Sequence, residues 1–228
     1  MSKIYAISDI HGCFNTFVEC LNTIGLNKSD KLFLLGDYID RGIHSIKTID
    51  KIIELQEDGY KVQCLTGNHE EMMLESIEDP GFASIWLSNG GNTVLNELGI
   101  TEVNEIPQRY IDFAKGLKHY IESDNFIFVH AGLNLSLEDP LSDRESLTWI
   151  RGWEGHKNLN PFLSGRKVIH GHTPKLRNEI EKRFQLCLEG SHPVLDIDNG
   201  CVFNKTGYNS LCCANLSDGI LHFQKNCD

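Results

Sequence analysis

The sequence predicts an α/β fold in which two sheets pack face to face and helices cover their outer sides. Three observations support this. The first third of the chain alternates short apolar strands with amphipathic helices, the last part contains strands alone, and polar clusters follow the ends of several strands. Parallel strands first and antiparallel strands last imply that the sheets are mixed.

The first third of the chain repeats a strand and a helix three times. Each strand is a short apolar run, and each helix shows apolar residues three or four positions apart. Strand-helix-strand units of this length imply right-handed parallel crossovers. The expected strands are 3–8, 31–35 and 61–65, and the expected helices are 14–24, 45–57 and 70–77.

The rest of the chain is predicted as a helical insert followed by more strands. The insert, at about 79–118, begins at the Asp79-Pro80-Gly81 break and contains two helices, 82–98 and 107–117. No order is assigned to 133–164, which is rich in loop residues. All of 1–228 is expected to form a single domain. The later strands are expected at 119–122, 125–129, 167–170, 194–197, 210–216 and 220–224.

Composition narrows the functional classes. The chain has 228 residues, enough for one sizeable core, and a formal net charge of -11. This charge argues against a nucleic-acid partner or an anionic membrane surface, because both need local positive charge. It does not exclude a phosphorylated substrate. No apolar run is long enough for a signal peptide or a membrane span, so we expect a cytoplasmic protein. Its eight cysteines lack a CxxC pair and are expected to be reduced thiols.

Five polar clusters carry the chemical signal, and each follows a predicted strand. Together they supply carboxylates, imidazoles and an asparagine, which are the donors that hold a pair of divalent metals. Two adjacent metals suit phosphate ester hydrolysis, because one site must bind the attacking and the leaving oxygens. The clusters are Asp9-Ile10-His11, Gly36 to Gly42, Gly67-Asn68-His69-Glu70, His130-Ala131-Gly132 and Gly171-His172-Thr173.

The first two clusters differ in specificity. Asp9 and His11 are two residues apart at the end of a strand, so both side chains could face one metal, although a strand-end turn with a solvated Asp9 explains this pair better when it is taken alone. The second cluster is more specific. Asp37 is placed to give one oxygen to each metal, and Arg41 can bind two phosphate oxygens with its planar guanidinium.

The third cluster suggests a ligand beside a proton donor. The amide oxygen of Asn68 is a reasonable ligand, although Asn68 is also suited to cap the following helix, and the two roles are compatible. His69 is better used as a general acid toward the leaving oxygen. Asp40 could orient it and raise its pKa.

For two of the remaining site positions, the sequence offers two nearby residues of the same type. His130 and His172 end apolar strands and could bind metal as neutral imidazoles. His170 competes with His172, but we interpret it as a structural residue inside the strand. For a second phosphate-binding arginine we favour Arg151 over Arg144, which lies in an acidic run and is expected to be solvated.

The order and spacing of these clusters resemble the calcineurin-like metallophosphoesterases. The stretches 36–42 and 67–70 are similar to the phosphoprotein phosphatase branch, and the short chain resembles its bacterial and phage lambda-type serine/threonine phosphatases. Trp149-Ile150-Arg151 and Trp86 to Gly91 also resemble segments of that branch. The resemblance implies a four-layer α/β/β/α sandwich.

The resemblance also implies roles for the site residues. One metal would be bound by Asp9, His11 and Asp37, and the second by Asp37, Asn68, His130 and His172. His69 paired with Asp40 would donate the proton, and Arg41 and Arg151, together with Asn68, would hold the phosphate. We expect two divalent ions, with Mn²⁺ preferred, although Fe, Zn, Co or Ni also suit such ligands.

These roles lead to a functional hypothesis with one close alternative. The hypothesis is a dimetal phosphomonoesterase, a serine/threonine or dual-specificity protein phosphatase in which a metal-bridging hydroxide attacks phosphorus directly. Its partner would be a phosphorylated protein or a small phosphoester. The alternative is a hydrolase of symmetrical dinucleoside polyphosphates, such as diadenosine tetraphosphate, or of nucleotide caps, in which Trp86 could stack on a base or simply pack in the core. Asp40 favours the phosphatase, because the alternative enzymes usually lack aspartate there. Since every expected catalytic position is filled, a non-catalytic binding module is disfavoured.

Overall fold

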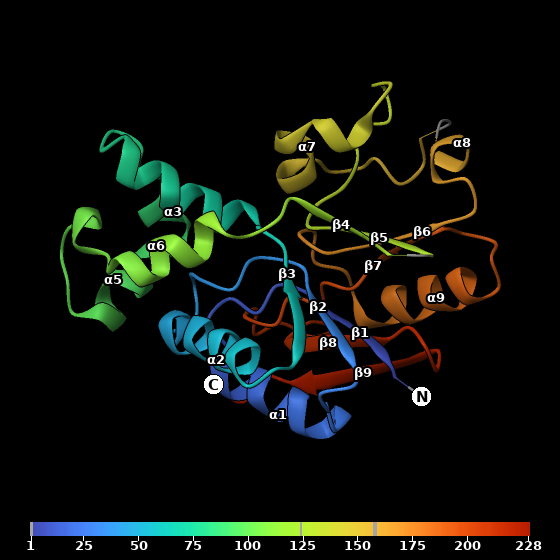
Figure 1. Ribbon diagram of the computed structural model, residues 1–228, viewed down its shortest axis with the longest axis horizontal. Coiled ribbons are helices and arrows are strands. Elements are labelled where there is room, and N and C mark those ends of the chain that lie inside the picture. Colours follow the sequence, from blue (N-terminus) through green and yellow to red (C-terminus); the bar gives the residue numbers. More distant parts are fainter. Residues whose placement is uncertain (1, 124, 157–158) are drawn as a thin grey trace.

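The computed structural model describes residues 2–123, 125–156 and 159–228, and its architecture is a four-layer α/β/β/α sandwich (Figure 1). A five-stranded sheet has the order β3-β2-β1-β8-β9, and a four-stranded sheet has the order β4-β5-β6-β7. Each sheet contains both parallel and antiparallel pairs. The predicted fold class is therefore confirmed.

The strands lie close to their predicted positions. In the first sheet, β1 (Ile4–Ile7), β2 (Lys31–Leu34) and β3 (Lys61–Cys64) are parallel, and β8 (Ser210–Asn215) and β9 (Ile220–Lys225) are added antiparallel. In the second, β5 (Phe126–Val129), β6 (Lys167–His170) and β7 (Val194–Asp196) are parallel, and β4 (Tyr120–Ser123) is antiparallel to β5. The carboxyl ends of the parallel strands are where such sheets carry their functional loops.

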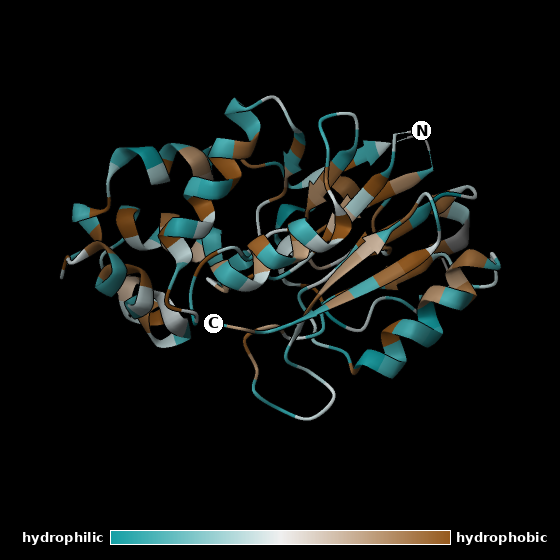
Figure 2. Cartoon of the chain, turned by 90° about the horizontal axis from the view of Figure 1, so that it is seen from below, coloured by the Kyte–Doolittle hydropathy of each residue, from teal (hydrophilic) through white to brown (hydrophobic). Residues whose placement is uncertain are grey.

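One hydrophobic core lies between the two sheets, and a larger one lies between the first sheet and the helices. Alternate strand residues point to opposite faces, so Ala6 and Phe33 face the second sheet, whereas Tyr5 and Ile7 belong to the core beneath the outer helices. The rings of Phe33 and Phe128 stack across the interface with centroids 4.0 Å apart. Figure 2 shows these apolar strands enclosed by helices whose outer faces are hydrophilic. This packing holds the ends of both sheets in fixed positions.

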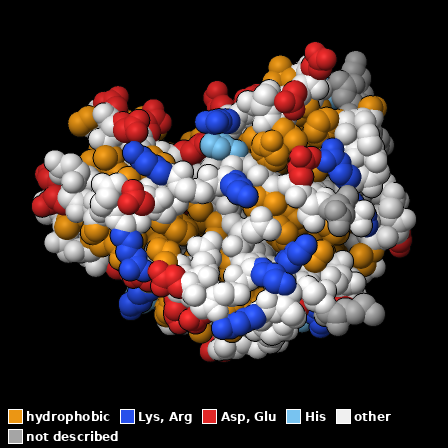
Figure 3. Space-filling view, in the orientation of Figure 1, with side chains coloured by type: hydrophobic (Ala, Val, Ile, Leu, Met, Phe, Trp, Pro, Cys, Tyr) orange, Lys and Arg blue, Asp and Glu red, His pale blue; other side chains and the backbone are white. Residues whose placement is uncertain are grey.

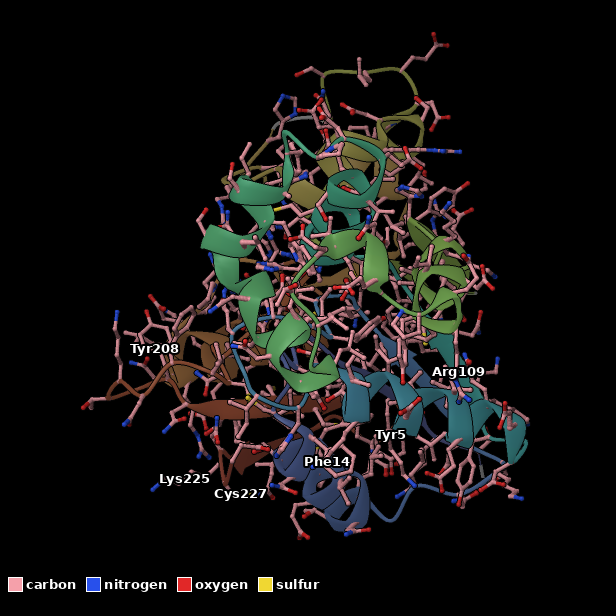
Figure 4. The ribbon with its side chains drawn as sticks, turned by 90° about the vertical axis from the view of Figure 1, so that its left-hand side faces the viewer. Tyr5, Phe14, Arg109, Tyr208, Lys225 and Cys227 are labelled. Atoms are coloured by element: carbon pink, nitrogen blue, oxygen red, sulfur yellow. The ribbon has the colours of Figure 1, made fainter. Side chains whose placement is uncertain are left out.

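Helices cover both outer faces. α1 (Phe14–Ile24) and α2 (Ser45–Glu57) pack on the first sheet, while α7 (Arg144–Trp149) and α8 (Leu159–Leu163) pack on the second. The carboxylate of Asp228 accepts hydrogen bonds from the backbone N–H groups of Asn15 and Thr16, each 3.0 Å long, and so caps α1. Figure 4 shows the neighbouring Cys227 below Phe14 at this end of the helix.

A helical lobe stands at one side of the sandwich, and Figure 3 shows a notch between it and the part that carries α7. The single helix predicted over 82–98 is wrong, because the chain bends at Gly90, whose φ of 116° is accessible to glycine. The lobe contains α3 (Asn68–Glu78), α4 (Ala83–Trp86), the short turn η1 (Leu87–Gly91), α5 (Asn92–Leu98), η2 (Val103–Glu105) and α6 (Gln108–Lys115).

Five of the described elements were absent from the sequence prediction: η2, α7 and α8, whose bounds are given above, and two more. The other two are η3 (Pro140–Ser142) and α9 (Arg177–Leu188). In α9, Ile180, Phe184 and Cys187 are buried in the core between the sheets, and their spacing of four and three residues was a helical signal. All eight cysteines are free thiols. Across the described residues, every helix is too short or too polar to cross a bilayer.

Candidate active site

The predicted site residues meet at one edge of the sandwich, beyond the ends of five strands. Asp9 and His11 follow β1, Asp37 follows β2, Asn68 follows β3, His130 follows β5 and His172 follows β6, and all six are buried. Among the described positions, eight non-glycine residues have positive φ, and six of them belong to this site: Asp9, His11, Asp37, Asp40, Arg41 and His172. Backbone conformations that are unfavourable for side-chain-bearing residues are thus concentrated where the chemistry is expected.

The first donor cluster consists of Asp37, Asn68, His130 and His172. The Nδ1–H of His130 donates to the carbonyl of Leu35 at 2.8 Å, which leaves a lone pair on Nε2. This Nε2 lies 3.1 Å from Asn68 Oδ1 and 3.5 Å from Asp37 Oδ1, and His172 Nδ1 lies 3.0 Å from the same Asn68 oxygen. With His130 in this tautomer, its lone pair and the oxygens of Asn68 and Asp37 converge with no proton between them. A divalent cation fits this arrangement.

The second donor cluster contains His11, Asp37 and His69. The Nδ1–H of His11 donates to the carbonyl of Ile39 at 2.8 Å, so its Nε2 also carries a lone pair, 3.5 Å from Asp37 Oδ2. A guanidinium nitrogen of Arg41 approaches this Nε2 to 2.6 Å. Asp37 therefore turns one oxygen to each cluster, the arrangement expected of a bridging ligand. His69, predicted as a proton donor, also lies in this cluster, with Nε2 3.9 Å from Asp37 Oδ2.

Asp9 is held at the site by a different contact. Its carboxylate accepts the backbone N–H of His172, at 3.2 and 3.1 Å, and the hydroxyl of Ser8. Among the described residues, Asp9 lies outside every three-residue group whose ligand atoms are closely spaced. Asp9 thereby ties the end of β1 to the end of β6, next to a candidate ligand.

Burial sets the protonation of the ligands. It lowers the pKa of His172 to about 3 and holds the pKa of His11 well below its ordinary value. Burial alone would raise the pKa of Asp37, but the surrounding histidines outweigh it and lower that pKa. Neutral imidazoles around an ionised carboxylate are the protonation states that metal binding requires.

His69 belongs to a buried chain of hydrogen bonds. Its Nδ1 lies 2.6 Å from Asp40 Oδ2, and the indole N–H of Trp86 donates to both oxygens of Asp40, at 3.1 and 2.9 Å. Burial disfavours the charged imidazole, yet the carboxylates of Asp37 and Asp40 outweigh it and raise the pKa of His69. Trp86 is fully buried. It therefore cannot stack on a nucleotide base, and the interpretation of Trp86 as a base-binding residue is wrong.

Glu70 shapes the site in a way that the sequence did not reveal. Its carboxylate accepts four backbone N–H groups, those of Gly67 and of the three consecutive residues 37–39, at distances from 2.8 to 3.3 Å. Glutamate at the third position of a helix is a known capping pattern, and that pattern explains the bond to Gly67. The other three bonds fix the loop that carries Asp37, and nothing local in the sequence signals them.

Two arginines flank the donor clusters. Arg41 lies beside His11, and its guanidinium stands over the ring of Phe203, 5.7 Å from the centroid. Arg151 donates to the carbonyl of His172 at 3.2 Å and to the hydroxyl of Thr173 at 2.8 Å. Each arginine thus stands next to a different cluster. Arg144 begins α7, and His170 ends β6, as its interpretation as a strand residue required.

Comparisons with known proteins agree with this geometry. Residues 2–188 match the family model described as calcineurin-like phosphoesterase. The symmetrical bis(5'-nucleosyl)-tetraphosphatase of Nitrosomonas europaea is 32% identical over 174 residues, which are 75% of this chain and 58% of that protein. The asymmetrical bis(5'-nucleosyl)-tetraphosphatase PrpE of a Geobacillus strain is 25% identical over 229 residues, covering 88% of this chain and 86% of that protein. The chain spans about half the length of the symmetrical tetraphosphatases that it matches.

Solved structures show the same fold. A putative diadenosine tetraphosphatase superposes with a TM-score of 0.67 at 18% identity, covering 97% of this chain and 92% of the other. The cold-active protein-tyrosine phosphatase of a Shewanella species gives a TM-score of 0.66 at 16% identity, with coverage of 99% and 81%. At these identities the likeness shows the fold alone, so the phosphoprotein phosphatase branch is not established. From its family match, its fold and its converging donors, the chain belongs to the calcineurin-like phosphoesterase family, whose members are metal-dependent hydrolases of phosphoric esters.

Proposed function

We propose that this chain is a dimetal hydrolase of dinucleoside polyphosphates. The observation that carries the proposal is that its tetraphosphatase relatives align over 75% and 88% of the chain. The two arginines suit such a substrate. Arg41 and Arg151 stand beside different clusters, so they can bind different phosphates of an extended polyphosphate.

The roles of individual residues follow from their contacts. His11, Asp37 and Asp9 would hold one metal, and Asp37, Asn68, His130 and His172 the other. Bound metals would supply an activated water nucleophile and neutralise charge on the phosphate. The guanidinium of Arg41 would turn from His11 toward phosphate oxygens, with Phe203 supporting its stem and plane. Arg151 would bind from the opposite side while Thr173 orients it.

A second candidate function, hydrolysis of phosphomonoesters such as phosphoserine, is favoured by the His69–Asp40 hydrogen bond of 2.6 Å. An alcohol leaving group is strongly basic and needs a proton as it departs, which a positioned imidazole can give. A nucleotide leaves through a phosphate oxygen, which is weakly basic and needs no such help. The raised pKa of His69 suits the first kind of leaving group.

A substrate comparison separates the two candidates. Diadenosine tetraphosphate and a phosphoserine peptide would be compared by kcat/KM on metal-loaded wild type, on His69→Asn and on the control His222→Asn, which alters a histidine on β9 far along the chain from the clusters. A dinucleotide hydrolase should prefer diadenosine tetraphosphate by at least about 10-fold and lose little with His69→Asn. A phosphomonoesterase should prefer the peptide and lose about 10²–10⁴-fold with that variant. Failure of the wild type on both substrates would contradict both candidates.

A further inference from the structure

A third group of ligand-type side chains lies outside the active site. It contains Glu154, His170 and Asp196, each of which places one donor atom within 4.8 Å of the others. His170 and Asp196 are the last residues of β6 and β7 and are paired in register across the sheet. Glu154 comes from the loop after α7. No residue of this group belongs to the two donor clusters described above.

The imidazole of His170 is oriented as a metal-binding histidine would be. It is 2% exposed, and its Nδ1 lies 3.2 Å from the carbonyl of Gly171. Because a carbonyl can only accept, Nδ1 carries the proton and Nε2 keeps its lone pair. This Nε2 has no hydrogen-bond partner and lies 4.0 Å from an oxygen of Glu154. A buried acceptor without a donor costs free energy unless a cation satisfies it.

Asp196 presents a second unsatisfied acceptor to the same space. Its side chain is 3% exposed, and Oδ1 accepts the backbone N–H of Asp198 at 2.9 Å. Oδ2 has no hydrogen-bond partner. Two buried acceptors on adjacent strands, one nitrogen and one oxygen, therefore face a third acceptor on Glu154. This is the donor chemistry that a zinc ion takes, with one imidazole and two carboxylates.

We propose that Glu154, His170 and Asp196 form a third, structural metal site that binds Zn²⁺. A cavity of about 340 Å³ opens beside it and is lined by Glu154, Lys175 and Asp196 together with residues of α9. The cavity gives the ion an entry path and room for a water as fourth ligand. Since Glu154 lies three residues after Arg151, the ion would fix the loop that carries Arg151 to the ends of β6 and β7.

Two basic side chains compete for the same carboxylates. Lys175 Nζ lies 3.5 Å from Glu154 and 3.8 Å from Asp196, and Arg183 lies 3.5 Å from the other oxygen of Glu154. The alternative is that these ion pairs alone satisfy the carboxylates. They leave Nε2 of His170 unpartnered, however, and the lysine side chain is 31% exposed and flexible enough to turn outward. Zinc would then displace the ammonium group, so Lys175 should weaken binding.

Metal titration of the full chain tests the site. Protein stripped with a chelator would be titrated with Zn²⁺, and bound zinc would be counted by elemental analysis and located by anomalous scattering. We expect wild type and the control His222→Gln to bind one more equivalent than His170→Gln. We also expect Lys175→Met to bind that equivalent about 10-fold more tightly, which is a gain that a misfolded variant cannot show.

The opposite results would overturn the proposal. Equal zinc content in wild type and His170→Gln, or an unchanged affinity in Lys175→Met, would mean that the ion pairs alone occupy the site. An anomalous peak between Glu154, His170 and Asp196 would support the proposed zinc site. Anomalous density for zinc only at the two active-site clusters would contradict it. None of these outcomes depends on which phosphoester the enzyme hydrolyses.

Discussion

The indole N–H of Trp86 donates to both carboxylate oxygens of Asp40, at 3.1 and 2.9 Å, across 46 positions of sequence. Trp86 ends α4 in the helical lobe, whereas Asp40 lies in the loop after β2. A second contact joins the same parts, because the backbone N–H of Arg41 donates to the carbonyl of Gly90 at 3.3 Å. The lobe therefore supports Asp40, which contacts His69, and Arg41, which we propose as a phosphate ligand.

Replacing Trp86 with phenylalanine should weaken proton donation without removing it. The ring is kept, but Asp40 loses a buried donor and holds His69 less firmly. We expect kcat to fall about 3- to 30-fold on an alkyl phosphate and to change much less on p-nitrophenyl phosphate, whose leaving group needs little protonation. Tyr120→Phe is the control, since this residue of β4 is 38% exposed. Equal losses on both substrates would contradict a role through Asp40.

Glu70→Gln should destabilise the fold through the loop that carries Asp37. In the wild type, both carboxylate oxygens accept backbone N–H groups. In the variant, an NH₂ group would replace one of these oxygens and leave its N–H donors without an acceptor. Leaving buried donors unsatisfied costs about 1–3 kcal/mol per group, so we expect a loss of about 3 kcal/mol of unfolding free energy in a urea titration. Glu75→Gln, on the exposed side of the same helix, should change stability by less than about 0.5 kcal/mol. A small effect at Glu70 would show that the loop is held by other contacts.

Gly171→Ala should disturb metal binding more than folding. A methyl group at this position would overlap the hydroxyl of Ser8 and an oxygen of Asp9, so the carboxylate that ties β1 to His172 must move. We expect at least one equivalent of metal to be lost on dialysis and activity to fall 100-fold or more. The control is Gly155→Ala, where an added Cβ meets open space and φ is ordinary. Full metal content in Gly171→Ala would contradict this geometry.

The unfolding free energy of the metal-free protein should fall as pH is lowered from 6.5 toward 4, in part because His170 is buried. Burial lowers the pKa of this imidazole to about 4, whereas the unfolded chain titrates near 6.5. Between these values the unfolded state binds more protons, so unfolding free energy rises with pH. In a chelator, His170→Asn should reduce this slope by up to about 1.4 kcal/mol per pH unit, measured by urea unfolding at pH 5 and 7. Identical slopes in both proteins would refute the assignment.

The sequence revealed the strands and the donor residues because both depend on local patterns. An apolar run followed by Asp37 or His130 predicts a strand end with a polar group beyond it, and parallel strands bring such ends together. Local patterns could not predict the hydrogen bonds from the backbone of residues 37–39 to Glu70 or the hydrogen bond from Trp86 to Asp40. Each joins parts of the chain whose separation in space is set by packing of the lobe, and Trp86 alone is an ordinary core residue. The break at Gly90 could have been predicted, because Asn89-Gly90-Gly91 contains dipeptides that mark turns.

The six site residues with positive φ have a consequence for how this protein can change. Each such conformation costs of the order of 1 kcal/mol in a residue with a side chain, a cost that glycine or asparagine would largely avoid. Selection for heat resistance alone should therefore favour replacing Asp9, Asp37 and Asp40, to which we assign metal binding and the orientation of His69. Thermostable variants selected without an activity screen should therefore fold but lack activity. Retention of the three strained aspartates would indicate that a variant has remained under selection for turnover.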